Sequence, residues 1–228
     1  MVVDVDRCTG CQACVVACQV ENNAPLSSEE SFQRRRPMQW IRIERYWEGE
    51  YPHIKARFLP LLCQQCGNAP CEPVCPVYAT YHNREGLNVQ IYPRCIGTRF
   101  CANNCPYNAR FFNWVEHQWP PVMANYLNPH VTVRPRGIME KCTFCIHRLH
   151  RAQRQAKGEG RVLRDGEVQP ACVQTCPTNA LVFGNLKDPN SRVSSMVQDE
   201  RHYRLLEELG TEPSVVYLKK VVPGGRAS

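Results

Sequence analysis

The sequence lacks any apolar run long enough to cross a lipid bilayer. A membrane-spanning helix needs about 18 or more consecutive apolar residues, and the longest apolar runs here, such as residues 58–63, are far shorter. Residues 1–7 also lack the basic stretch and apolar core that mark a secretory signal. We therefore expect a chain that is not an integral membrane protein and has no secretory signal.

Two further absences exclude other classes of protein. No glycine-rich phosphate loop or nucleotide-binding fingerprint occurs in the sequence, so nucleotide-dependent chemistry is not expected. The cysteine count is 15, and an odd number argues against a complete disulfide framework. With 43% hydrophobic residues, the chain is nevertheless too apolar to be disordered. The cysteines must have another purpose.

The cysteines fall into four groups with the spacing of metal ligands. The first group reads C-x2-C-x2-C-x3-C, the run that wraps four-iron clusters. The other three groups each end in Cys-Pro, and the third group has only three cysteines. The groups are Cys8, Cys11, Cys14 and Cys18; Cys63, Cys66, Cys71 and Cys75; Cys95, Cys101 and Cys105; and Cys142, Cys145, Cys172 and Cys176. Together they use every cysteine, so none is left for a disulfide or a nucleophilic thiol.

A rule from two-cluster ferredoxins predicts which cysteines share a cluster. In those proteins the last cysteine of each run binds the other cluster, which pairs the first group with the fourth and the second with the third. We expect three four-iron sites and one incomplete site. Site I is Cys8, Cys11, Cys14 and Cys176; site II is Cys142, Cys145, Cys172 and Cys18; site III is Cys63, Cys66, Cys71 and Cys105; site IV is Cys95, Cys101 and Cys75.

Thr98 stands where the C-x2-C register of site IV calls for a cysteine. A threonine hydroxyl is a poor iron ligand beside soft thiolates, so a three-iron cluster is the favoured interpretation. A four-iron cluster with water or the Thr98 oxygen as its fourth ligand is the main alternative. An open iron that binds substrate is disfavoured, because no acid–base residues lie nearby in the sequence.

Zinc binding is the alternative to iron–sulfur chemistry, since C-x2-C pairs are common zinc ligands. Structural zinc sites rarely use three cysteines within seven residues and a fourth four positions later, as residues 8–18 do. The formal charge of +7 would suit nucleic acid, but four clusters of about −2 each would offset it. We therefore expect no nucleic-acid partner.

The predicted fold class is α+β, with two ferredoxin-like dicluster units related by pseudo-symmetry. It is loop-rich and has a C-terminal helix and strand. Residues 1–60 plus 136–185 would hold two 4Fe-4S clusters, and residues 61–112 one 4Fe-4S and one 3Fe-4S cluster. Residues 113–135 would connect them, and 186–228 would form an extension. Alternation and composition predict strands at 39–45, 87–91, 181–183 and 214–222, helices at 146–157 and 199–209, and a loose tail at 223–228.

A compact chain of this length is roughly 45 Å across, so four clusters would lie close enough for electron tunnelling. Clusters with a full set of thiolates exchange electrons but bind no substrate. We therefore expect an electron-transfer chain that is not catalytic alone.

Several stretches resemble one protein family. They are MQWIRI at 38–43, CIGTRFCANNCPY at 95–107, VTVR at 131–134, MEKCTFC at 139–145 and LLEEL at 205–209. They are similar to the four-cluster iron–sulfur subunits of the dimethyl sulfoxide reductase superfamily, and within it to the ActB iron–sulfur domain of bacterial alternative complex III. The iron–sulfur subunit of the quinone reductase complex is similar as well.

The resemblance implies three 4Fe-4S clusters and one 3Fe-4S cluster, with the three-iron cluster nearest the membrane. It implies three partners: a polytopic NrfD-type quinone-binding subunit, multihaem cytochrome c subunits, and a molybdopterin-fold subunit with or without its cofactor. The expected function is electron transfer from quinol in an alternative complex III. The alternative is the same role in a molybdopterin oxidoreductase that reduces polysulfide, thiosulfate, tetrathionate or arsenate. Either complex would hold the chain at the membrane through its partners, on the outer face.

Overall fold

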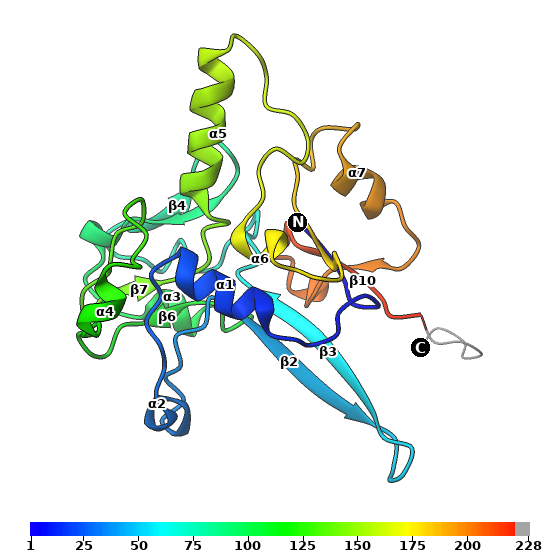
Figure 1. The fold of residues 1–228 in the computed structure, drawn as a ribbon, viewed down its shortest axis with the longest axis horizontal. Coiled ribbons are helices and arrows are strands. Elements are labelled where there is room, and N and C mark those ends of the chain that lie inside the picture. Colours follow the sequence, from blue (N-terminus) through cyan, green and yellow to red (C-terminus); the bar gives the residue numbers. More distant parts are fainter. Residues whose placement is uncertain (222–228) are drawn as a thin grey trace.

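The computed structural model describes residues 1–221, which form short helices and strands joined by long loops (Figure 1). The strands are β1 (Val2–Asp4), β2 (Ile41–Glu48), β3 (Lys55–Leu62), β4 (Thr80–His82), β5 (Asn88–Gln90), β6 (Phe111–Phe112), β7 (Met139–Glu140), β8 (Leu181–Val182), β9 (His202–Tyr203) and β10 (Val216–Leu218). The α-helices are α1 (Ala13–Glu21), α2 (Glu29–Gln33), α3 (Phe100–Asn103), α4 (Pro121–Ala124), α5 (Ile146–Gly158), α6 (Ala171–Gln174) and α7 (Arg192–Val197). Two 3-10 turns, η1 (Tyr92–Arg94) and η2 (Glu207–Leu209), complete the set.

The strand pairs link the four cysteine groups in a closed cycle. β2 and β3 pair between the first and second groups, β4 and β5 between the second and third, and β6 and β7 between the third and fourth. β8, which follows the fourth group, pairs antiparallel with β1, which precedes the first. Each group therefore lies along the chain between two strands that belong to different hydrogen-bonded pairs. The pairs β1–β8 and β4–β5 occupy equivalent places in two ferredoxin-like units, as the predicted fold class requires.

The C-terminal extension joins the sheet of the first unit. β10 lies between β1, to which it runs parallel, and β9, to which it runs antiparallel. Val193 of α7 is buried against this sheet with Val2, Val216 and Leu218. The extension is thus part of the folded body and covers the strand that leads to the first cysteine group.

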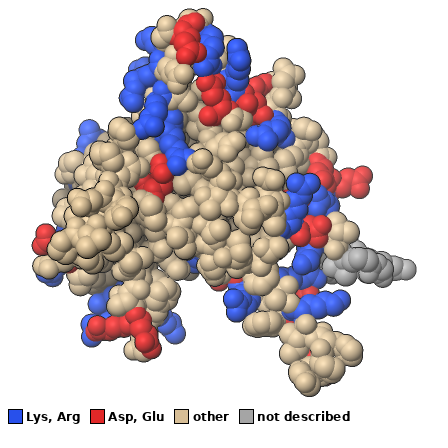
Figure 2. All heavy atoms as spheres, viewed as in Figure 1, with Lys and Arg blue, Asp and Glu red and all other residues tan. Residues whose placement is uncertain are grey.

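Two long elements are among those that project from the body in Figure 1. One is α5, of which only Ala156 is buried. The other is the long β2–β3 hairpin, which is buried at its base by Ile41 and Leu62 and exposed toward its tip. In Figure 2 lysine and arginine side chains gather over the projecting α5 region, whereas much of the front of the body is uncharged. Within the described chain, no helix combines the length and the apolarity that a bilayer span requires.

Most of the predicted elements are confirmed. The strands at 39–45, 87–91 and 181–183 appear as β2, β5 and β8, and the helix at 146–157 as α5. The strand at 214–222 is the shorter β10; residue 222 and the predicted tail at 223–228 lie outside the described residues.

The predicted helix at 199–209 is wrong. The Asp199 carboxylate accepts a hydrogen bond from the backbone N–H of Arg201 and binds its guanidinium, which makes a turn. Leu206, at φ 50°, is left-handed and interrupts a helix again. The segment forms β9 and η2 instead, and its apolar residues Tyr203 and Leu205 pack against the core. The helix of the C-terminal extension is α7.

Candidate iron–sulfur centres

The first and third cysteine groups have the same backbone conformation. Gly10 and Gly97 have φ of 73° and 75°, and two residues later Gln12 and Arg99 have φ of 66° and 63°. A helix begins directly after Gln12 and directly after Arg99. This match places Thr98 at the loop position that Cys11 occupies in the first group. The second and fourth groups match in the same way, because Gln65 and Phe144, each just before the second cysteine of its group, are both left-handed.

The three Cys-Pro sites share a second motif, Cys-Pro-x-x-Ala, at residues 75–79, 105–109 and 176–180. The residue before each alanine is left-handed, with φ of 50°, 48° and 52° at Tyr78, Asn108 and Asn179. This conformation turns the alanine N–H back toward the cysteine: the N–H of Ala79 lies 3.2 Å from Cys75 Sγ, and that of Ala180 lies 3.2 Å from Cys176 Sγ. The backbone N–H of Ala109 makes the equivalent bond to Cys105. All three alanines are 1% exposed, so there is no room for a larger side chain.

These turns favour the thiolate form, which is the form that binds iron. Burial raises the pKa of the Cys75 thiol, but hydrogen bonds from the backbone of Val77, Ala79 and Thr80 bring it below its usual value. Cys176 behaves in the same way, since bonds from Thr178, Ala180 and Leu181 outweigh burial and lower its pKa.

The other thiols lie in groups whose members raise one another's pKa. Burial raises the pKa of Cys14 to about 12, and the neighbouring Cys8, Cys176 and Cys11 add to the increase. Burial also raises the pKa of Cys18, with further contributions from Cys142, Cys172 and Cys145. In both groups, residues from opposite ends of the chain meet, and they are the cysteines that the sequence assigns to sites I and II.

The cysteines of sites III and IV also lie together. Burial raises the pKa of Cys66 to about 12, and Cys63, Cys105 and Cys71 contribute as well. A small cleft at site IV is lined by Cys75, Cys95, Cys101 and Thr98. Met139 donates its backbone N–H to Cys95 Sγ at 3.4 Å.

These donor sets fit iron–sulfur clusters. All the candidate ligands are sulfur, and backbone amides point at several of the sulfurs, as cluster-binding loops require. Within residues 1–221, no three His, Cys, Asp or Glu side chains are placed to hold a single metal ion.

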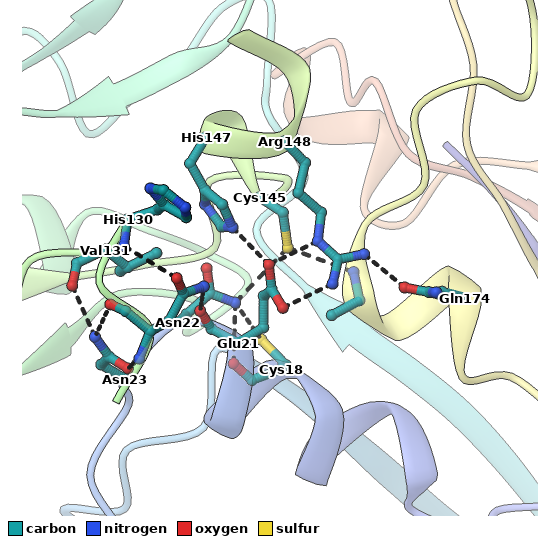
Figure 3. A network of polar contacts seen from close by, with 12 residues as sticks. Cys18, Glu21, Asn22, Asn23, His130, Val131, Cys145, His147, Arg148 and Gln174 are labelled. Carbon is teal, nitrogen blue, oxygen red and sulfur yellow. Dashed lines mark hydrogen bonds and ion pairs between the residues drawn. The ribbon is translucent and has the colours of Figure 1, made fainter. Parts of the chain in front are cut away.

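Polar side chains surround site II (Figure 3). The side-chain amide of Asn22 donates to Cys18 Sγ at 3.6 Å and to Cys145 Sγ at 3.7 Å. Beside it, Glu21 accepts two hydrogen bonds from the Arg148 guanidinium, at 2.6 and 2.7 Å, and lies 2.6 Å from His147 Nε2. These contacts join α1 to α5 next to the sulfurs. Burial raises the pKa of Glu21, but the bonds from Arg148 and His147 outweigh it and lower the pKa.

The sequence did not reveal the buried charged residues near the sites, which are Arg110, Arg134, Glu140 and Lys141. From sequence alone, the charged side chains of a basic chain are expected at the surface. Two signals were present: the three-fold repetition of Cys-Pro-x-x-Ala, which Arg110 follows once, and the position of Lys141 directly before Cys142.

Comparison with known proteins defines the class. Residues 7–79 and 94–180 match one model of a 4Fe-4S dicluster domain, and residues 54–121 match another. The chain is therefore an iron–sulfur protein built from two dicluster ferredoxin-like domains, and the zinc alternative is wrong.

Relatives of known function narrow the family. The chain is 46% identical to the iron–sulfur cluster-binding subunit of menaquinone reductase from Nitratidesulfovibrio vulgaris, over 96% of this chain and 88% of that protein. It is 40% identical to iron–sulfur subunit 1 of the Hdr-like menaquinol oxidoreductase from Archaeoglobus fulgidus (96% and 82%). It is 33% identical to the iron–sulfur subunit of arsenate respiratory reductase from a Shewanella species (96% and 95%). The chain belongs to this family of electron-transfer iron–sulfur subunits of multisubunit oxidoreductases. These relatives support the wider family rather than the alternative complex III branch.

Proposed function

We propose that the chain carries electrons through four clusters within a quinone-linked membrane oxidoreductase. Sites I, II and III would hold 4Fe-4S clusters and site IV a 3Fe-4S cluster, in the two units whose boundaries the sequence predicts. When bound, these clusters accept and release single electrons. The chain's own residues hold the thiolates, donate backbone N–H groups to them and exclude water from all but the edges of the sites.

The identity of 46% to a menaquinone reductase subunit carries this proposal. A second relative is named for menaquinol and a third for arsenate. These names favour a complex with a quinone-binding NrfD-type membrane subunit and a catalytic subunit of the molybdopterin enzyme type, which is the alternative that the sequence offered.

Alternative complex III is the second candidate. The stretch at 95–107, with Thr98 in the place of a cysteine, supports it. In that case multihaem cytochrome c subunits would replace molybdenum as the electron acceptor, and the molybdopterin-fold subunit would lack its cofactor. Attachment to the membrane through these partners, on its outer face, is part of both proposals.

Exposed apolar side chains support site IV as the end that meets the membrane subunit. Tyr78, Ile96 and Phe100 flank its cysteines and are 74%, 64% and 55% exposed. Clusters of exposed apolar residues mark interaction sites more often than free surface. A partner bound to these side chains would contact residues that neighbour Cys75, Cys95 and Cys101 in the sequence.

The residues lining the site IV cleft suit electron transfer without proton transfer. Among the described residues, the lining includes Gln90, Thr98 and Arg99 but no His, Asp or Glu. Quinone chemistry moves protons together with electrons, and proton transfer needs a titratable group within hydrogen-bond reach. We therefore place the proton-handling groups in the partner subunit.

The test is to isolate the chain with its partners from native membranes and to assay iron, molybdenum and haem c in the same sample. Four clusters predict about 15 iron atoms per chain, from three cubanes of four and one cluster of three. Molybdenum in proportion to the chain supports the molybdopterin enzyme, and abundant haem c without molybdenum supports alternative complex III. Two outcomes would refute both proposals. One is recovery of the chain without a membrane partner. The other is a complex in which menaquinone does not oxidise the reduced clusters and menaquinol does not reduce the oxidised ones.

A further inference from the structure

Lys141 is a buried lysine without an acidic partner. Its side chain is 0% exposed, and its ammonium donates to the backbone carbonyl of Cys142 at 2.9 Å and lies 3.6 Å from Cys63 Sγ. Across residues 1–221, no Asp or Glu lies within ion-pair distance of it. Burying an ammonium without a counter-charge costs several kcal/mol, so a negative charge must lie nearby.

The adjacent Glu140 does not supply that charge. Its carboxylate binds the guanidinium of Arg134 at 2.7 Å and accepts from the Trp40 indole at 3.2 Å. Successive residues of an extended chain point to opposite sides, so Glu140 and Lys141 face different surroundings. The groups that Lys141 contacts are the Cys63 sulfur and the backbone carbonyl of Cys142.

These two contacted residues belong to different sites. Cys63 is a candidate ligand of site III, and Cys142 of site II. The positive charge of Lys141 opposes the burial that raises the pKa of both Cys71 and Cys142. Lys141 therefore lies between sites II and III and acts on both.

Arg110 is a second buried cation beside site III. It is 7% exposed, and its guanidinium donates to Gln90 at 2.9 Å, to Asn88 at 2.7 Å and to Thr80, and also hydrogen-bonds the Cys101 sulfur of site IV. Its charge acts on the sulfurs of Cys71 in site III and Cys101 in site IV. At site I the cation that acts on Cys8 is Lys220, which is exposed.

We propose that Lys141 and Arg110 are fixed internal cations, each shared by two successive clusters, that raise the midpoint potentials of the clusters on either side. Lys141 serves sites II and III, and Arg110 serves sites III and IV, so site III is flanked by both. The inference rests on the proposed ligand sets. Its physical basis is that each reduction adds one electron, and a cation held at short range in a poorly screened interior stabilises the reduced form more than the oxidised form.

The pattern of shifts distinguishes tuning from a general structural effect. In Lys141→Met, the midpoint potentials of sites II and III fall and those of sites I and IV do not change. In Arg110→Met, the potentials of sites III and IV fall and those of sites I and II do not. Lys141→Arg keeps the positive charge, so its potentials are those of the wild type. Neither residue binds iron, and each acts on the clusters through its charge.

The experiment is an electron paramagnetic resonance redox titration of the whole complex, wild type and variants. Cys11→Ser, Cys145→Ser and Cys66→Ser assign the signals of sites I, II and III. Potentials that stay unchanged in Lys141→Met and Arg110→Met, with all clusters retained, would overturn the proposal. So would equal shifts at all four sites.

Assembly is monitored separately by counting iron in each sample. If Lys141→Met loses clusters, Lys141→Gln, which keeps a hydrogen-bond donor, is titrated in its place. If neither neutral variant assembles while Lys141→Arg does, the cation is required for assembly and the tuning role is rejected. A wild-type chain without four clusters would instead refute the proposed function, and would do so before any variant is compared.

Discussion

The guanidinium of Arg134 and the carboxylate of Glu140 form an ion pair of 2.7 Å in the interior, where their side chains are 0% and 1% exposed. Arg134 also donates to the backbone carbonyls of Asn22 and Asn23, at 2.8 and 3.0 Å, and lies over the Trp40 ring. One side chain thus holds the connecting segment, the end of α1 and β7 together. The helix α1 carries Cys14 and Cys18 of the first cysteine group, and β7 leads to Cys142 of the fourth.

Glu140→Gln leaves the Arg134 guanidinium buried without a counter-charge. Removing one partner of a buried pair costs about 3–5 kcal/mol. We therefore expect unfolding, followed by circular dichroism, to have its midpoint at a clearly lower concentration of guanidinium chloride. The control is Glu30→Gln, which breaks an ion pair whose side chains are 62% and 66% exposed. An exposed pair contributes about 0–1 kcal/mol. Equal effects of the two substitutions would contradict the structural role of Arg134.

Thr98→Cys restores the ligand that the first group has at Cys11. We expect the three-iron cluster of site IV to become a four-iron cluster, with about one more iron atom per chain, and quinol-driven reduction to slow. The measurements are the iron content, the electron paramagnetic resonance spectrum and the rate of cluster reduction. Thr98→Ser is the control and keeps the wild-type spectrum. Unchanged spectra and rates in Thr98→Cys would contradict the assignment of site IV.

The cysteine spacing predicted the dicluster fold. It could do so because a cluster constrains how many residues separate its ligands. Apolar periodicity carried less information, as the wrong helix at 199–209 demonstrates: the hydrogen bond of the Asp199 carboxylate to Arg201 stops a helix that the pattern of Tyr203 and Leu205 suggested. Sequence reasoning missed the burial of Lys141 and Arg110, because some of the sulfurs beside them, Cys63 for Lys141 and Cys71 for Arg110, are distant in sequence.

Gly97 is required by its surroundings as well as by its φ of 75°. A Cβ at this position would collide with the backbone carbonyl oxygen of Gly137, which neither backbone segment can avoid by a side-chain movement. We expect Gly97→Ala to displace the loop that carries Cys95 and Thr98, and to lower the occupancy of site IV in spin quantitation. Gly86→Ala is a matched control: its φ is 77°, and a Cβ there meets nothing within 4 Å. If both variants lose the site IV signal, the loss is due to the positive φ and not to a collision with Gly137.

Asn22 and Asn23 are adjacent, but only one of them contacts sulfur. The Asn22 amide donates to Cys18 Sγ and Cys145 Sγ, whereas the Asn23 amide donates to the backbone carbonyls of Asn128 and Val131. Hydrogen bonds to ligand sulfurs withdraw negative charge and raise a cluster's potential. We therefore expect Asn22→Ala to lower the midpoint potential of site II and of no other site.

Asn23→Gly is the control, because glycine accepts the φ of 47° that Asn23 has. It removes hydrogen bonds to the loop at 128–131, each worth about 1 kcal/mol, and should lower the thermal midpoint of the complex while leaving the potential of site II unchanged. A lowered potential in Asn23→Gly, or an unchanged one in Asn22→Ala with site II fully occupied, would mean that the potential does not depend on the sulfur contacts of Asn22. The two measurements together separate tuning of the cluster from stability of the loop that covers it.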